Sequence, residues 1–187
     1  PGDQFIKEFL PQCTDAEKAQ IAKEYVKFNE RSMIRLLGDM RAYNYVVVPT
    51  HDFDQVVYKI RPIDFDQQSF EGKLSVYRPQ FFKENKALMD LVRTKLTHNS
   101  INQYKIEERS IVARRIISSG NRLESLVKIM QSETLTLQEN LERLRQEIYK
   151  FTKDKAFTQS ESMGDIVQAS LRFVRRHYEK VDMHDLF

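Results

Sequence analysis

The sequence is poor in several features, and each shortage excludes a class of protein. It has one cysteine, Cys13, so no disulfide framework within the chain can support the fold. A lone cysteine also favours a reducing compartment, and we therefore expect the cytoplasm. No apolar run approaches the ~18 residues of a membrane-spanning helix, and no signal-peptide pattern is present. We expect no membrane partner.

Histidine and net charge are also scarce. Four histidines are scattered along the chain, and none pairs with Cys13 at the spacing of a zinc site. Thirty basic residues face 27 acidic ones, a net charge of +3 that does not call for nucleic acid. A stripe of arginines at 172, 175 and 176 is interpreted as a solvated or acid-paired helix face, because such stripes usually are. Nucleic acid is not an expected partner.

Hydrophobic residues are abundant enough to form a core. They make up 41% of the 187 residues, and aromatic residues make up 11%. The chain contains no internal repeat and no low-complexity linker, so residues 1–187 are predicted to form a single domain. The sequence opens with Pro-Gly-Asp rather than with Met. We therefore expect it to be a piece of a longer protein.

Helical signals dominate the chain. Thr14-Asp-Ala-Glu17 is a capping box, which predicts a helix that ends near Gly38. Ser162-Met-Gly-Asp165 predicts another helix start, and the glycine in 118–121 predicts a break. Further helices are expected over 79–97, 103–118, 123–131, 135–151 and 163–179.

Two runs rich in valine and isoleucine, residues 45–48 and 56–63, are typical of strands. The polar connector "PTHDFDQ" joins them, which predicts a β-hairpin with a loop longer than two residues. Two strands are too few for a doubly wound parallel sheet. The predicted fold class is therefore α+β, mainly α-helical, with one small β-hairpin.

Polar side chains flank this hairpin in "GDMRAYNYVVV" (38–48) and "IRPIDFDQQ" (60–68). Asp39 follows a helix, Asn44 precedes the first strand, and Asp64 closes the second. If the two strands pair, all three lie at the same end of the hairpin. Mg²⁺ prefers carboxylate and amide oxygens and completes its shell with waters and phosphates. A further carboxylate can then orient a hydroxyl group and accept its proton, while Asp66 can assist the metal.

The two segments resemble the catalytic loop and the metal-binding turn of the protein-kinase-like fold. The nearest resemblance is to small-molecule kinases of the aminoglycoside-phosphotransferase type, because of the Gly-Asp pair and because Asp-Phe-Asp stands in place of Asp-Phe-Gly. The resemblance implies that Asp39 is the catalytic base and that Arg41 supports the transferred phosphoryl group. It also implies that Asn44 and Asp64 bind Mg²⁺ and the cofactor ATP, with Asp66 as a further metal ligand.

The resemblance covers residues 36–68 and implies that the chain is a kinase-like C-terminal lobe. Only 38 residues precede Asp39, too few for a lobe with a Gly-rich loop and a strand-borne lysine. The expected partners are therefore ATP, an unknown hydroxyl acceptor and the N-terminal lobe of the parent protein. We expect the chain to be inactive without that lobe.

Two alternatives stay open. Asp39, Asn44 and Asp64 could simply form turns, in which case the chain would be a non-catalytic helical interaction module. Leu37 stands where these kinases usually have histidine, so a pseudokinase is also possible. A second Asp-Phe-Asp, at 52–54, is interpreted as the hairpin tip, since no apolar strand leads straight into it.

Overall fold

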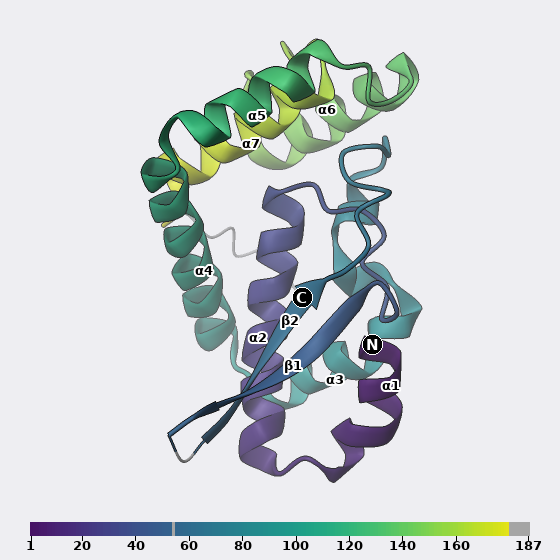
Figure 1. Cartoon of the computed structure of the whole chain (residues 1–187), viewed down its shortest axis with the longest axis vertical. Coiled ribbons are helices and arrows are strands. Elements are labelled where there is room, and N and C mark those ends of the chain that lie inside the picture. The colour runs from purple at the N-terminus through teal and green to yellow at the C-terminus, as the bar shows by residue number, and fades with distance from the viewer. Residues whose placement is uncertain (54, 180–187) are drawn as a thin grey trace.

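The computed structural model describes residues 1–53 and 55–179, and it confirms a mainly helical α+β fold with one antiparallel hairpin (Figure 1). No helix within these described ranges is long and apolar enough to cross a membrane. The longer elements are α2 (Asp15–Ile34), β1 (Tyr45–Asp52), β2 (Gln55–Pro62), α3 (Lys86–Lys95), α4 (His98–Ser118), α5 (Gly120–Ser132), α6 (Gln138–Thr152) and α7 (Met163–His177). A short helix α1 (Gly2–Gln4), a π-helical turn (Phe5–Phe9) and a 3₁₀ turn (Leu10–Gln12) precede them, and three 3₁₀ turns (Leu74–Tyr77, Pro79–Phe81, Lys83–Asn85) precede α3.

Helix α2 begins where its capping box predicts. The Thr14 hydroxyl accepts a hydrogen bond from the Glu17 amide at 3.3 Å, and the Glu17 carboxylate accepts one from the Thr14 amide at 2.7 Å. The predicted end near Gly38 is wrong, because α2 ends at Ile34 and Leu36 makes the reversal with φ of 49°. Glycine is needed at position 38 for a different reason, because a Cβ there would overlap the carbonyl oxygen of Gln67.

The hairpin is longer and its loop shorter than predicted. Strand pairing runs from Tyr45 opposite Pro62 to Asp52 opposite Gln55, which leaves only positions 53 and 54 between the strands. The polar connector is therefore mostly strand, because backbone pairing across the hairpin continues into residues that have little local strand signal. Phe53 adopts φ of 51°, as the tight two-residue turns of hairpins require.

The predicted helix boundaries need two further corrections. Residues 79–85 form 3₁₀ turns rather than helix, and α3 begins only at Lys86. In contrast, α4 begins five residues before the predicted position 103, since Thr97 caps it by accepting a hydrogen bond from the Ser100 amide. The predicted Ser162 cap of α7 and the break between α4 and α5 are confirmed, while α5, α6 and α7 differ from prediction by a few residues at their ends.

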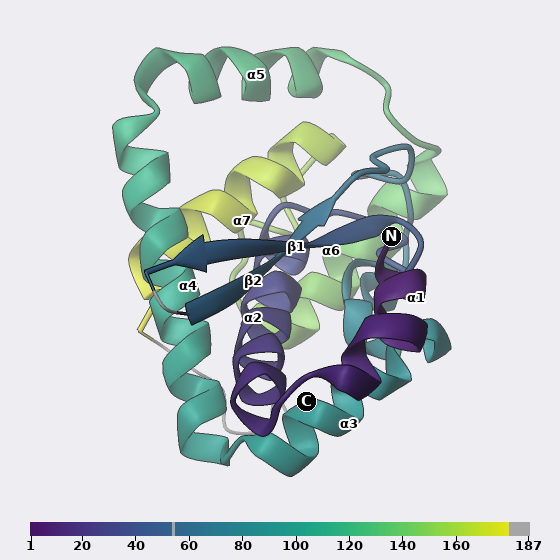
Figure 2. The ribbon, with the colours of Figure 1, turned by 60° about the horizontal axis from the view of Figure 1, so that its bottom comes forward.

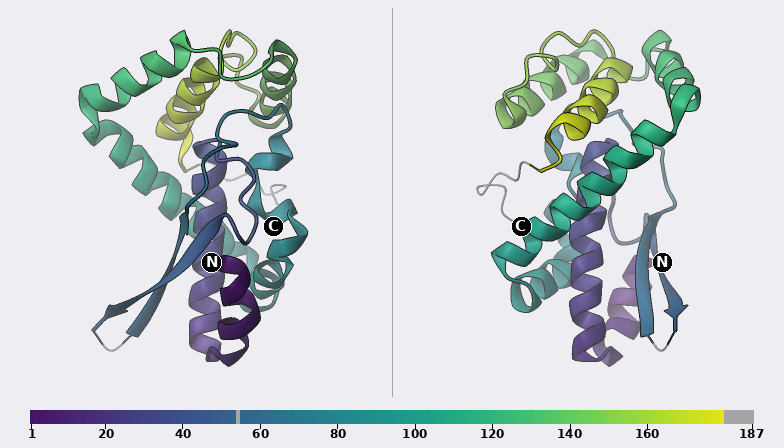
Figure 3. Two further views of the ribbon diagram at one scale, coloured as in Figure 1. Left: turned by 45° about the vertical axis from the view of Figure 1, so that its right-hand side comes forward. Right: turned by 90° about the vertical axis from the view of Figure 1, so that its left-hand side faces the viewer.

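The elements form two layers around α2. The hairpin, α1 and α3 surround α2 in the lower layer, α5, α6 and α7 form the upper layer, and α4 runs from one to the other (Figure 1, Figure 3). Each layer has its own core cluster. Leu36 belongs to the upper cluster, whereas Met40 and Ala42 belong to the lower one. The segment that connects α2 to β1 is therefore anchored on both sides, and it carries the candidate site.

Candidate functional site

The loop between α2 and β1 is a compact turn with a defined backbone. The Asp39 amide donates to the Val76 carbonyl at 3.1 Å, and the Arg41 amide donates to the Asp39 carbonyl at 2.8 Å. The Asn44 amide in turn donates to the Arg41 carbonyl at 2.9 Å. Asp39 has φ of 54°, a left-handed conformation that aspartate tolerates better than most residues. The loop therefore holds Asp39 in one orientation.

Asn44 is tied to Asp39. Its side-chain Nδ2 donates to the Asp39 carbonyl at 2.8 Å and to Asp39 Oδ2 at 3.3 Å. Because the amide nitrogen is used in this way, Oδ1 is the acceptor that remains, and no donor among the described residues binds it. Asn44 is only 8% exposed, so this oxygen lies in a partly desolvated place. It is a suitable ligand for a hard cation.

Arg41 neutralises Asp39. Its Nε donates to Asp39 Oδ1 at 2.7 Å, and its Nη1 lies 3.6 Å from the Glu84 carboxylate. The guanidinium also stacks over the Phe82 ring, 5.2 Å from the ring centre. The hydrogen bond with Asp39, and then the charge of Asp39, raise the pKa of Arg41 above its usual value. The side chains of Asp39 and Arg41 remain 28% and 40% exposed, so a ligand can reach both.

The hairpin brings Asp64 to the same place. The Ile63 amide donates to the Asn44 carbonyl at 3.0 Å, which extends the strand ladder by one step and places Asp64 directly after it. Asp64 Oδ1 accepts from the Asp66 amide at 3.0 Å, and this short turn leaves Oδ2 available. The structure therefore brings Asp39, Asn44 and Asp64 to one end of the hairpin, as the pattern predicts. Their chemical roles stay predictions.

Asp66 and Phe65 are exposed. The carboxylate of Asp66 faces solvent, and its described hydrogen bond is made by its backbone amide. The segment itself is held against α2's end, because the Ser69 amide donates to the Leu36 carbonyl at 2.9 Å. Together with the close contact between Gly38 and Gln67, this fixes the turn beside the loop. The geometry allows Asp66 to assist a metal but does not place it in the cluster.

The sequence patterns missed the residue that holds the loop. Asn85 is completely buried, and its Nδ2 donates to the carbonyls of Met40 and Pro79, each at 2.9 Å. Its Oδ1 accepts from the Tyr45 hydroxyl at 2.8 Å. Asn85 thus joins the loop, the start of β1 and a 3₁₀ turn. No local pattern in "FFKENKALMD" distinguishes it from an ordinary surface asparagine.

The second Asp-Phe-Asp lies at the opposite end of the hairpin. Asp52 is exposed and pairs with Gln55 at the tip, whereas Tyr45 pairs with Pro62 at the base. Eight paired residues at about 3.4 Å each separate the two ends by roughly 24 Å. Position 54 lies outside the described residues. Asp52 therefore belongs to the tip, as interpreted from the sequence.

The donor set at the base of the hairpin consists of oxygen atoms, which are the ligands of hard divalent cations. Across residues 1–53 and 55–179, no three His, Cys, Asp or Glu side chains gather closely enough to form a metal site by themselves. One amide oxygen from Asn44 and one carboxylate from Asp64 match Mg²⁺, which retains waters and takes phosphate oxygens as its other ligands.

Comparison with protein-family models found no matching family, and comparisons with curated proteins and with solved structures found no significant match.

Proposed function

We propose that this chain is the C-terminal lobe of a kinase-like phosphotransferase that moves the γ-phosphoryl group of ATP to a hydroxyl acceptor. One observation carries the proposal. Asp39, Asn44 and Asp64 come from a loop and a turn that are twenty residues apart, and the hairpin register puts both segments at the same end of the hairpin. A catalytic carboxylate, an amide oxygen and a metal-binding carboxylate are the side chains that phosphoryl transfer needs.

The hydrogen bonds support a separate role for each residue in the proposed reaction. Asp39 is the candidate base, and the Nε of Arg41 together with the Nδ2 of Asn44 would orient its carboxylate toward the acceptor. Asn44 Oδ1 and Asp64 Oδ2 are the atoms that would bind Mg²⁺, which when bound neutralises phosphate charge. Arg41, which stays partly exposed, would add positive charge near the transferred group.

The proposal includes a second lobe. Residues 1–38 form α1, α2, short helical turns and loops, and none of them is in a strand or a Gly-rich loop. The phosphates of ATP would have to be covered by a lobe of the parent protein, which would supply further positive charge. Nucleotide binding by these 187 residues alone should accordingly be weak.

The metal ligands can be tested on this chain directly. Mn²⁺, a paramagnetic substitute for Mg²⁺, should broaden the backbone amide resonances of Asn44 and of residues 64–66 before any others. Asp64→Asn should abolish this broadening. Asp52→Asn is the matched control, since it makes the same change at the other Asp-Phe-Asp and should have no effect. Selective broadening at the hairpin tip would contradict the proposal.

The base can be tested in a protein that also contains the covering lobe. Asp39→Asn should lower kcat by about 10²- to 10⁴-fold while leaving the apparent affinity for ATP unchanged. Asp64→Asn should weaken both nucleotide affinity and turnover, because it removes a charge from the metal shell. ATP consumption by coupled assay measures both. Wild-type turnover and nucleotide affinity in both variants would rule out catalysis by these acids.

Absence of turnover in the wild-type parent protein would instead make the non-catalytic helical module the better account. The structure contains a feature that favours it, because both carboxylate oxygens of Asp39 already accept hydrogen bonds within the loop and Asp64 caps its own turn. In that case the acids only shape the loop, and Asp39→Asn and Asp64→Asn would change its conformation but no activity.

A further inference from the structure

A large hollow lies on the side of the molecule formed by the end of α2, α4, α5 and α7. Its volume is about 670 Å³, within the range of ~300–1,000 Å³ that is usual for small-molecule sites. The apolar part of its lining includes Val112, Ile116, Leu123, Leu126, Met130 and Leu171. Gln68, from the turn after β2, closes one side.

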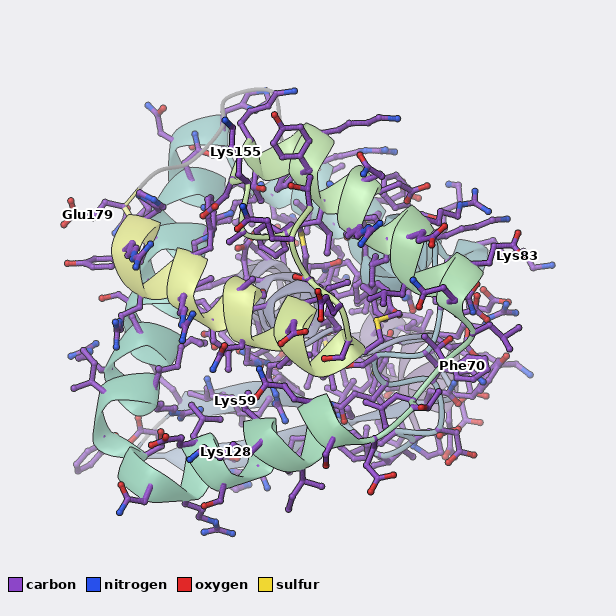
Figure 4. The ribbon with its side chains drawn as sticks, turned by 90° about the horizontal axis from the view of Figure 1, so that it is seen from above. Lys59, Phe70, Lys83, Lys128, Lys155 and Glu179 are labelled. Carbon is purple, nitrogen blue, oxygen red and sulfur yellow. The ribbon has the colours of Figure 1, made fainter. Side chains whose placement is uncertain are left out.

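Helix α5 contributes apolar side chains of the lining that remain exposed to solvent. Leu123, Leu126, Val127 and Met130 follow helical spacing, so they share one face. Helix α5 packs against α7 where the end of α5 meets the start of α7, and the two helices diverge from there in Figure 2 and Figure 4. Only Val127 of α5 is fully buried, and Leu126 remains 54% exposed. The helix thus presents more apolar surface to the hollow than its neighbours cover, which marks a binding surface.

Four arginines line the same hollow: Arg31, Arg35, Arg115 and Arg122. Arg31 is neutralised, because it lies 2.7 Å from Glu24 and 3.4 Å from Glu108. For the other three guanidinium groups, no carboxylate of the described residues lies within ion-pair distance.

Arg35 lies among like charges. Desolvation, and then the charges of Arg31 and Arg115, lower the pKa of Arg35 below its usual value. Like charges gathered beside apolar surface are unfavourable in the empty protein, and an anion would relieve their repulsion.

We propose that this hollow binds a small single-chain amphiphile with a phosphate monoester head. The chain would lie on the apolar lining of α4, α5 and α7, and the head would contact Arg35, Arg115 and Arg122. Guanidinium groups form paired hydrogen bonds with phosphate oxygens, and a doubly charged head would balance the local excess of positive charge. Walls from four helices and a turn form a bowl, which suits a compact ligand better than the helix of a partner protein. The proposal is independent of the phosphotransferase proposal.

The probe is dodecyl phosphate below its micelle concentration, titrated by calorimetry into the whole chain. We expect one site per chain. Arg35→Gln and Arg115→Gln should each weaken binding about tenfold, the effect of removing one charge-assisted contact. Leu126→Ser, at an exposed position that tolerates a polar side chain, should weaken it through loss of apolar contact. Arg93→Gln in α3, with the same charge change outside the hollow, should bind like the wild type.

Three outcomes would overturn the proposal. Inorganic phosphate could bind as tightly as dodecyl phosphate, which would show that the chain contributes nothing. The Arg35, Arg115 and Leu126 variants could all bind like the wild type, which would place the ligand elsewhere. An acidic amphipathic peptide could bind at these residues while dodecyl phosphate does not, which would assign the hollow to a partner protein.

Discussion

Replacing Asn85 with leucine should loosen the candidate loop more than any surface change nearby. Leucine has nearly the same size, so the substitution removes hydrogen bonds without leaving a large cavity. Two groups lose their only described partner, the carbonyl of Met40 and the hydroxyl of Tyr45, while the Pro79 carbonyl still accepts from the Phe82 amide at 3.2 Å. Met40 and Tyr45 are buried, so water cannot readily replace the lost contacts.

The expected cost follows from the number of orphaned groups. A buried polar group without a partner costs about 1–3 kcal/mol. Taking the lower part of that range for each of the two, Asn85→Leu should lower the free energy of unfolding by about 2–4 kcal/mol. For a chain of this length, that corresponds to a decrease in Tm of roughly 5–10 °C. The lost donor to Met40 should also move the amide chemical shifts of residues 39–44.

Urea unfolding followed by circular dichroism measures the change, and Tyr45→Phe provides the comparison. Removing only the hydroxyl leaves Asn85 with its two donated hydrogen bonds, so we expect a loss of about 1–2 kcal/mol. The double variant should show a coupling of about 1 kcal/mol, because the two side chains share one bond. A loss below about 1 kcal/mol for Asn85→Leu, with no coupling to Tyr45, would refute the assignment of Asn85 as the residue that holds the loop.

Two further predictions concern the backbone and the pH. Gly38→Ala should destabilise the fold strongly, because the added Cβ would overlap the Gln67 carbonyl. Gly120→Ala is the comparison: its Cβ would meet open space, so the loss in stability should be only about 1–2 kcal/mol, caused by its φ of +52°. Equal losses of stability for the two variants in urea unfolding would contradict this prediction. Hydrogen bonds from the Thr14 amide and hydroxyl hold the pKa of Glu17 below its usual 4.5. Its contribution to stability is therefore present above pH about 4.5 and is lost as the pH falls through the lowered pKa. The stability difference between the wild type and Glu17→Gln should shrink over that acidic range, and a difference that stays constant down to pH about 2 would disprove the linkage.

Local chemistry explains which parts of the fold could be predicted. Two helix starts are defined by capping boxes of four residues each, Thr14–Glu17 and Ser162–Asp165. Because the capping contacts are local, the sequence alone is enough to predict them. The length of the hairpin loop could not be predicted, because the strands continue through exposed polar residues. In those residues backbone pairing with the opposite strand, and not intrinsic strand propensity, determines the conformation. The start of α3 was also missed, because the contacts of Asn85 with Met40 and Tyr45 span 45 and 40 positions and leave no local pattern.

The candidate site was predictable only in part. Antiparallel strands bring the residue before the first strand and the residue after the second to one end, so the approach of Asn44 and Asp64 follows from topology. The ion pair between Arg41 and Glu84 spans 43 positions, and no spacing rule connects them. The arginines of the hollow likewise come from separate helices, and only the packing of those helices assembles them.

The hairpin has a consequence for how this chain can change in length. Its far end projects away from the helices, and Phe53 at its turn is 99% exposed (Figure 3). Residues added or removed as opposed pairs near that turn would leave the alignment of Tyr45 with Pro62 unchanged. One residue deleted from a single strand would instead shift that alignment and turn alternate side chains to the opposite face. The chain can therefore tolerate paired insertions at the far end, while an unpaired deletion within either strand would separate Asn44 from Asp64.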